Sequence, residues 1–185
     1  MTTMKSAVFS KPGAWLVSLP FVASLLIATP GMTTEAPRLS LEGPFSLEGT
    51  WVMTSAYEIL ADGTRTTTYG EHPNGLLMVD KDGRYSLQIF RPDRPKFASG
   101  DKTRGTPQEY RDAVLGASTH TGHVVIDPVK DKLVFKIDAA SYPNWEGAQQ
   151  VRDYTFKDGI LTYSVPASAS GNGTIAYSIW QHVTQ

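Results

Sequence analysis

An arginine lies among aromatic residues in a stretch whose pattern predicts a β-strand. From Gln149 the sequence QQVRDYTF alternates, so that Gln150, Arg152, Tyr154 and Phe156 share one face of the strand. A buried charge is costly unless it is paired, so Arg152 needs a partner within the protein, a ligand, or access to water. A buried guanidinium group is also a good anchor for the carboxylate or enolate of a ligand. Arg152 is therefore the first candidate for a binding residue.

Two interpretations of Arg152 follow from the sequence. In the first, Arg152, Tyr154 and Tyr163 form a polar patch in an otherwise apolar interior and contact a ligand. In the second, Arg152 pairs with an internal Asp or Glu, or stacks on Trp145 or Trp51. The sequence alone favours a partner within the protein. A buried charge needs a partner, but that partner does not have to be a ligand.

The four histidines do not have the spacing of a metal site. His120 and His123 are three residues apart in a predicted strand, so they face opposite sides, while His72 lies in a turn and His182 near the C-terminus. One inward-facing histidine could still act as a general acid or base. The sequence contains no nucleophile elbow, phosphate-binding loop or dinucleotide fingerprint. We therefore expect no metal and no cofactor.

The composition predicts one globular domain with a substantial core. The chain has 185 residues, of which 41% are hydrophobic, with a net charge of -1 and a pI near 6.4. No basic face is implied, so nucleic acid is not an expected partner. The absence of cysteine excludes disulfides, a thiolate nucleophile and a cysteine metal site.

The N-terminal segment resembles a secretory signal. Lys5 and Lys11 precede an apolar run over residues 14–28, which is short and interrupted by proline. We predict a signal peptide or disordered leader over residues 1–36, with a retained membrane anchor as the alternative. The mature protein would then be secreted or periplasmic, without stable insertion in a membrane. Because there is no cysteine, a bacterial lipoprotein anchor is excluded.

Residues 45–185 read as a series of short strands joined by tight turns. The stretch LEGTWVMTSAYEIL alternates, with Trp51, Met53, Ser55 and Tyr57 expected on one face. Hairpin signals such as Lys-Asp-Gly separate the later apolar runs. The pattern predicts an all-β fold, an up-and-down antiparallel β-barrel of about eight strands, because closure removes exposed sheet edges. A barrel of this size is either filled by side chains or holds one small ligand.

One long loop, residues 91–117, interrupts the series of strands. It ends in a predicted short helix, with Thr106 as the N-cap, Pro107 at the first position and Glu109 at the third. A loop of this length in a small domain is often a lid or a binding loop. The alternative is a plug that covers one open end of the barrel.

Three stretches and one residue together resemble a known family. They are LEGTWVMTSAYEILADGTRTTTYGEHPNGLLMVDKDGRYSLQIFRPDRP, which contains the Gly49-Thr50-Trp51 motif, PNWEGAQQVRDYTFKDGILTYSVP, and the closing Trp180. The chain resembles the bacterial and fungal lipocalin-like domain family, a calycin-type barrel, from about Leu47 to Val183. The resemblance implies an up-and-down barrel with Trp51 sealing one end.

The chain departs from the family pattern at two places. His182 stands where the family commonly has an arginine, so either Arg152 or His182 is expected to cover Trp51. His120 and Val124 stand where relatives tend to have tyrosines. The chemistry of the interior is therefore expected to differ from that of close relatives.

The resemblance is strong evidence for the fold and weak evidence for the chemistry, because many members have no assigned activity and some fungal ones accompany specialised-metabolite pathways. Our first hypothesis is an exported barrel that binds a small, largely apolar molecule in its lumen. The alternatives are a cofactor-free cyclase or isomerase of a polyketide-like metabolite, and a packed barrel that acts through its surface. The candidate ligand-binding residues are Tyr57, Tyr85, Trp145, Arg152, Tyr154 and Tyr163.

Overall fold

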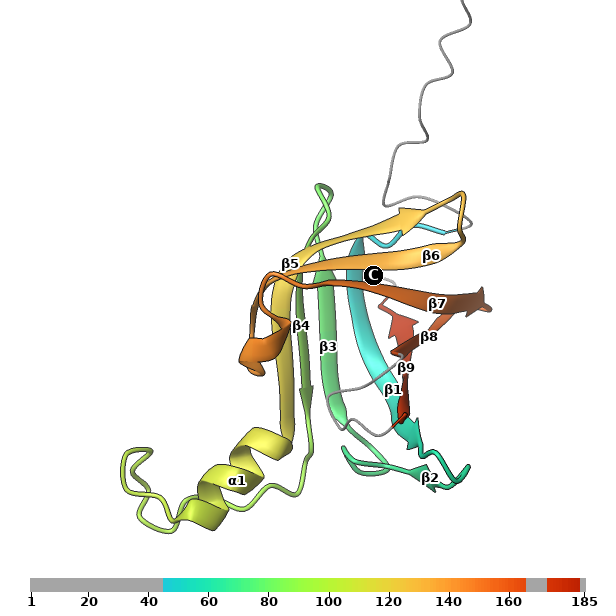
Figure 1. The fold of residues 1–185 in the computed structure, drawn as a ribbon. Helices are drawn as coiled ribbons and strands as arrows, with labels where there is room; N and C mark the ends of the chain where they lie inside the picture. Colours follow the sequence, from blue (N-terminus) through green and yellow to red (C-terminus); the bar gives the residue numbers. More distant parts are fainter. Residues whose placement is uncertain (1–44, 166–172, 184–185) are drawn as a thin grey trace, which may run out of the picture. The chain divides into compact units, whose positions relative to one another are not determined.

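The computed structural model describes residues 45–165 and 173–183. The predicted signal segment, residues 1–36, lies outside the described residues. The described part contains nine strands, one α-helix and one short 3₁₀ helix (Figure 1). The strands are β1 (Gly49–Ile59), β2 (Arg65–Thr66), β3 (Asn74–Val79), β4 (Arg84–Phe90), β5 (Ala117–Asp127), β6 (Lys132–Ala140), β7 (Gln149–Lys157), β8 (Ile160–Val165) and β9 (Ile175–His182).

The strands form a closed barrel. Within the described residues every strand pairs antiparallel with its neighbours, in the order β2-β1-β3-β4-β5-β6-β7-β8-β9, and β1 also pairs with β9. This last pairing closes eight strands into a barrel, while the two-residue β2 pairs with Glu58 and Ile59 of β1. The predicted up-and-down barrel of about eight strands is confirmed.

A β-bulge in β1 changes which side chains face inward. The register with β9 shifts between Met53 and Ser55. Trp51 and Met53 are buried before the bulge, and Ala56 and Glu58 are buried after it. The expected alternation, with Ser55 and Tyr57 on the same face as Trp51, is therefore wrong. An extra residue at a bulge moves the following side chains to the opposite face.

Two glycines permit close contacts between strands. A Cβ at Gly49, which has φ +123°, would lie 2.5 Å from Nε2 of His182. A Cβ at Gly122 would collide with the carbonyl oxygen of Lys136, at the register shift between β5 and β6. Both positions require glycine because a backbone or a ring approaches the chain there.

One end of the barrel is closed by an aromatic cluster around Trp51. The indole is 1% exposed, and its Nε1 donates a hydrogen bond to the carbonyl of Leu47 at 3.0 Å. Phe45 stacks on Phe156 with ring centroids 4.2 Å apart and meets Trp51 edge-on at 6.0 Å. The ring of His182 packs edge-on against Trp51 at 4.7 Å. Of the two residues expected to cover Trp51, His182 therefore has this role and Arg152 does not.

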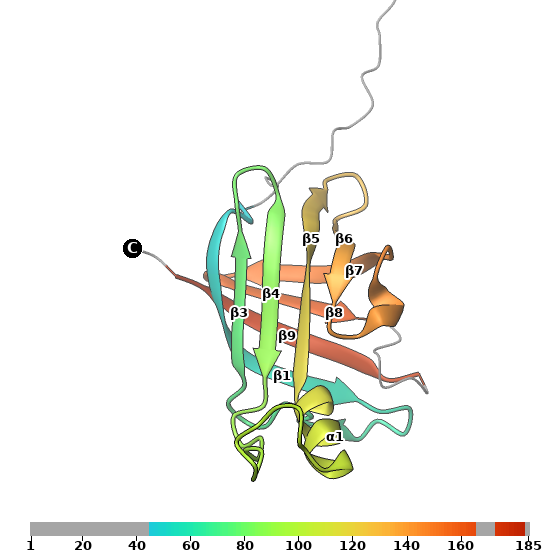
Figure 2. The same ribbon diagram turned by 90° about the vertical axis from the view of Figure 1, so that its left-hand side faces the viewer.

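The long loop after β4 carries the predicted helix, α1 (Pro107–Leu115). The Thr106 side chain accepts a hydrogen bond from the Glu109 backbone, and the Glu109 carboxylate accepts one from the Thr106 backbone, so the predicted capping box is confirmed. Figures 1 and 2 show α1 beside the end of the barrel where β4 ends and β5 begins. No helix in the described part of the chain is long and apolar enough to cross a membrane.

Candidate functional site

A cavity of about 370 Å³ lies inside the barrel, in the half away from the Trp51 cluster. Side chains of β1, β4, β5, β7, β8 and β9 surround it, together with the last turn of α1 and the 3₁₀ helix (Pro143–Trp145). Its volume is at the small end of the range of ligand pockets, roughly 300–1,000 Å³. The lining residues are Glu58, Thr68, Tyr69, Leu87, Ile89, Val114, Leu115, Ala117, Ser118, His120, Ser141, Tyr142, Trp145, Arg152, Tyr163, Val165, Ala176 and Ser178.

Solvent exposure distinguishes the floor of the cavity from its mouth. Val114 and Leu115 at the end of α1 are 64% and 51% exposed, so they form part of the rim. Leu87, Arg152 and Tyr163 are at most 3% exposed and form the floor. Of the residues of α1, only Val114 and Leu115 in its last turn line the cavity, so the helix borders the opening.

Arg152 is held at the floor by aromatic rings. Its guanidinium carbon lies 4.0 Å from the centroid of the Phe135 ring and 4.8 Å from that of Tyr163. Such cation–π contacts stabilise a desolvated guanidinium group. Its Nη2 also donates a hydrogen bond of 2.5 Å to Oε1 of Gln150, two residues earlier on the same face of β7. The alternation of β7 therefore positions both residues, as the sequence predicts.

No carboxylate compensates the charge of Arg152 in the described part of the chain. None of the ion pairs among residues 45–165 and 173–183 includes it, and its Nε is buried without a hydrogen-bond partner. Burial lowers the pKa of Arg152, while the nearby Tyr163 and Tyr85 oppose this change. An arginine side chain starts from so high a pKa that it stays protonated at neutral pH. The floor therefore carries a positive charge that no acidic residue in the described ranges pairs with.

A histidine and a tyrosine form a buried pair next to Arg152. The hydroxyl of Tyr85 lies 2.7 Å from Nδ1 of His120. Burial, with a smaller contribution from the positive charge of Arg152, lowers the pKa of His120 to about 3. Burial likewise raises the pKa of Tyr85. At neutral pH both groups are therefore uncharged.

The pairing of His120 with Tyr85 determines which ring nitrogen can meet a ligand. The Tyr85 hydroxyl has no other hydrogen-bond acceptor among the described residues, so it donates to Nδ1. A neutral imidazole carries one proton, which then resides on Nε2. Because His120 lines the cavity, this N–H is the group that it offers to a ligand.

The structure brings together three of the six predicted ligand-binding residues. Trp145, Arg152 and Tyr163 line the cavity. Tyr85 lies behind His120, within hydrogen-bond distance of its ring. Tyr154 belongs to the opposite end of the barrel, where its ring meets Phe45 at 5.6 Å.

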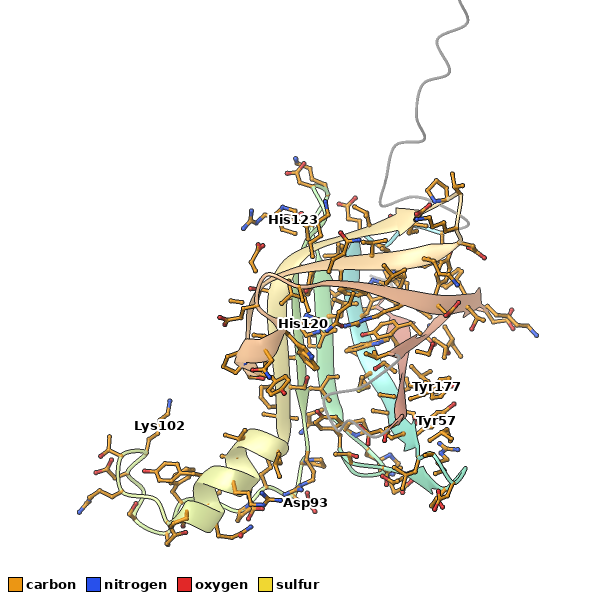
Figure 3. All side chains as sticks on the ribbon, viewed as in Figure 1. Tyr57, Asp93, Lys102, His120, His123 and Tyr177 are labelled. Carbon is orange, nitrogen blue, oxygen red and sulfur yellow. The ribbon has the colours of Figure 1, made fainter. Side chains whose placement is uncertain are left out.

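Tyr57 lies outside the barrel. It stacks on Tyr177 of β9, with ring centroids 4.9 Å apart, and Arg65 lies over its ring at 4.0 Å. Figure 3 shows Tyr57 and Tyr177 together on the outer side of β1 and β9. The bulge in β1 is the reason for this position, which is not part of the cavity lining.

Several polar lining residues are absent from the predicted set. Ser118 and His120 alternate on β5, and Ser178 lies on β9 two residues before Trp180. Their inward positions follow from strand alternation, so the signal was present in the sequence. Glu58 also lines the cavity, where its Oε2 accepts a hydrogen bond of 3.2 Å from Thr68. Strict alternation along β1 predicts that Glu58 faces outward, and the bulge turns it inward.

The histidines of β5 face opposite sides, as the sequence predicts. His120 is buried and points into the barrel, whereas His123 points outward and lies 3.9 Å from Asp138 (Figure 3). Among the described residues, no group of three or more His, Asp or Glu side chains has an arrangement that could hold a metal ion.

The closed barrel, the sealing Trp51 and the cavity define a lipocalin-like protein, and the sequence comparison agrees. A family model described as lipocalin-like domain matches residues 48–183, so the chain belongs to this family. The chain is also similar to the 4'-hydroxy-3'-methoxypropiophenone carrier protein ppsC of Aspergillus oryzae. The two are 25% identical over 104 residues, which cover 52% of this chain and 94% of the carrier protein.

Proposed function

We propose that this protein binds a small, largely apolar molecule in the cavity of its barrel and acts as a carrier without catalysis. The observation that supports this most is the 370 Å³ cavity itself. Aliphatic and aromatic side chains such as Leu87, Ile89 and Trp145 line it, together with residues that carry hydroxyl, imidazole, carboxylate or guanidinium groups. This composition is typical of sites for small organic ligands.

The similarity to a carrier protein supports the same class of function. The name of the Aspergillus oryzae relative describes a carrier of a substituted aromatic ketone. A molecule of one aromatic ring and a short side chain matches the modest volume of this cavity. We therefore propose small aromatic compounds as the first ligands to test.

A cavity-filling variant tests the proposal. Ala176 of β9 lines the cavity, and the neighbouring Ile175 is exposed on the same strand. Binding of 4'-hydroxy-3'-methoxypropiophenone would be measured by isothermal titration calorimetry. We expect Ala176→Trp to weaken binding by at least about tenfold, because a large side chain occupies ligand space, and Ile175→Trp to change it by less than about twofold. Equal affinities of both variants and the unmodified protein would place the ligand elsewhere and contradict the proposal.

Native mass spectrometry of the purified protein gives an independent check. A carrier with a preformed apolar cavity should retain a hydrophobic molecule from the expressing cells, or take up an added one at a ratio of one to one. A protein that neither retains nor takes up any small hydrophobic molecule would argue for a barrel that acts through its surface.

A cofactor-free cyclase or isomerase is the second candidate, because Arg152, Tyr163 and His120 meet in one cavity. Arg152 could stabilise an enolate, and His120 could move a proton. However, a histidine with a pKa of about 3, whose Nδ1 already accepts a hydrogen bond, is a weak base at neutral pH. Turnover of a polyketide-like intermediate that is lost in Arg152→Ala, with the fold intact, would favour the enzyme.

We further propose that the protein is exported. The support is the N-terminal sequence, with Lys5 and Lys11 ahead of the apolar run at residues 14–28. Cell fractionation followed by N-terminal sequencing of the mature protein would test this proposal. A protein that keeps its first residues and stays in the cytoplasm would contradict it.

A further inference from the structure

We infer that the floor of the cavity binds the negatively charged group of a small aromatic ligand, with the guanidinium group of Arg152 as its anchor. This inference rests on the proposed binding function and names the class of ligand. The preferred ligands would be aromatic monoanions, such as carboxylates, phenolates or enolates, in place of neutral aromatic compounds of the same shape.

The first support is the unbalanced charge of Arg152. The side chain is 3% exposed, lines the cavity and has no acidic partner within 4.0 Å among the described residues. Its contacts are the rings of Phe135 and Tyr163 and the amide oxygen of Gln150, all of which are uncharged. Of the five N–H groups on the guanidinium, one is bonded to this amide oxygen, the Tyr163 hydroxyl is a further hydrogen-bond partner, and Nε has no partner among the described residues. Hydrogen-bonding capacity and charge are therefore both left for a ligand.

The second support is the character of the neighbouring polar groups. With Nδ1 of His120 bonded to Tyr85, the histidine offers an N–H and no lone pair to the cavity. The hydroxyl groups of Tyr163 and Ser178 lie in the same lining and can also donate. Because donors gather around one cation, the floor suits an acceptor with negative charge and disfavours an ammonium group.

The arrangement also suggests how such a ligand would lie. The rings of Phe135 and Tyr163 lie 4.0 and 4.8 Å from the guanidinium carbon, so an oxyanion would meet the N–H groups that these rings leave open. Trp145, Ile89 and Val165 line the cavity together with the exposed rim residues of α1. The charged group would thus bind at the floor, and the apolar body would extend toward the mouth.

Glu58 is the acidic residue in the same lining, and it does not neutralise Arg152. It lies on β1, and its Oε2 accepts a hydrogen bond from Thr68. Since no ion pair joins Glu58 and Arg152, the two charges act at separate places in the cavity. A negative group on the ligand would therefore be favoured beside Arg152.

Two probes of nearly identical shape test the inference in the unmodified full chain. Calorimetric titrations at pH 7 would compare 2-naphthoate, which is an anion, with 2-naphthamide, which is neutral. We expect 2-naphthoate to bind at least about tenfold more tightly, because it makes a charge-assisted hydrogen bond with Arg152 in a dehydrated site. A ratio below about twofold would overturn the inference while leaving the proposed carrier function intact.

A pair of variants assigns the preference to one residue. Arg152→Met removes the charge from the cavity, and Arg84→Met removes one from an exposed position at the start of β4. We expect the preference for 2-naphthoate to disappear in Arg152→Met, with the affinity for 2-naphthamide changed by less than about threefold, and to remain in Arg84→Met. A preference that survives in a folded Arg152→Met protein would overturn the inference.

Two further outcomes are distinguishable. If Arg152→Met does not fold, the ratio between the two probes in the unmodified protein decides the inference on its own. If neither probe binds at the limit of its solubility, and the aromatic ketone does not bind either, the proposed carrier function fails and the inference fails with it.

Discussion

The two halves of the barrel interior use aromatic side chains in different ways. At the closed end, Trp51 is enclosed by Phe45, Phe156 and the ring of His182, and its indole N–H is bonded to a backbone carbonyl. In the other half, the rings of Phe135 and Tyr163 surround a cation beside open space. At the closed end, the ring nitrogens of Trp51 and His182 lie within hydrogen-bond distance of backbone carbonyls. In the cavity half, Nε of Arg152 has no hydrogen-bond partner among the described residues.

The difference suggests that the closed end around Trp51 contributes mainly to stability, and that the half with the cavity contributes mainly to binding. A filled aromatic cluster contributes burial and ring contacts to folding. A buried guanidinium group without a counter-ion contributes little to folding and costs free energy of desolvation. This cost falls beside the cavity, where a ligand can offset it, whereas at the closed end the ring of His182 packs against Trp51.

The largest expected effect is on the closed end. Replacing Trp51 by Ala should lower the free energy of unfolding by about 3–5 kcal/mol, because it removes the central side chain of a packed cluster and leaves a cavity. Urea unfolding followed by circular dichroism would measure this change. In protein that remains folded, affinity for an aromatic probe should change little, because Trp51 is not part of the cavity lining. A loss of binding larger than the loss of stability would show that the two ends are not separate.

A second expected effect is a pH dependence of stability that originates at the cavity. The pKa of His120 is about 3 in the folded protein and near 6.5 when unfolded, so the unfolded chain binds more protons between these values. Stability from this residue is therefore fully present above about pH 6.5 and falls as the pH drops toward 3. Between pH 7 and pH 5, we expect His120 to account for a loss of about 2 kcal/mol.

Matched histidine variants isolate this contribution. His120→Gln should remove the extra loss between pH 7 and pH 5, whereas His123→Gln should keep it, because His123 is on the outer face of the same strand with its side chain 43% exposed. Urea unfolding at several pH values would provide the comparison. Identical pH profiles for His120→Gln and the unmodified protein would mean that His120 titrates normally and is not shielded from water.

A third prediction concerns the stability of Arg152→Met, and it is opposite in sign to that for Trp51. Removal of an uncompensated buried charge should leave the free energy of unfolding unchanged or raise it by about 1 kcal/mol, since the loss of two cation–π contacts is offset by the desolvation that is avoided. Thermal and urea unfolding would measure it. A loss of more than about 2 kcal/mol would show that Arg152 mainly supports the fold.

The sequence predicts the elements of this fold well because their signals are local. Alternation, hairpin turns and the capping box of Thr106 and Glu109 each involve residues close in the chain, and the structure contains all of them. Arg152 and Tyr163 also face inward as expected, because β7 and β8 keep their alternation. These positions depend only on a regular pleat.

The remainder of the site depends on contacts between distant strands. The bulge in β1 arises from its pairing with β9, so the outward position of Tyr57 and the inward position of Glu58 do not follow from the sequence of β1 alone. The choice between His182 and Arg152 as the cover of Trp51 required the register of the last strand. Likewise, the volume of the cavity reflects the packing of all eight strands, which no local pattern encodes.

The last prediction compares the outer face of β1 with the cavity lining, and the smallest change in affinity is expected at Tyr57. Tyr57→Leu should cost about 0.5–1.5 kcal/mol of stability through the lost stack on Tyr177, and should change affinity for an aromatic probe by less than about twofold. Trp145→Leu is the matched change inside the cavity, where loss of ring contact should weaken binding by about tenfold. Calorimetric titration of both variants would separate the two roles. If Tyr57→Leu weakened binding as much as Trp145→Leu, the ligand would have to contact the outer side of β1, and the separation between binding inside the barrel and packing outside it would not hold.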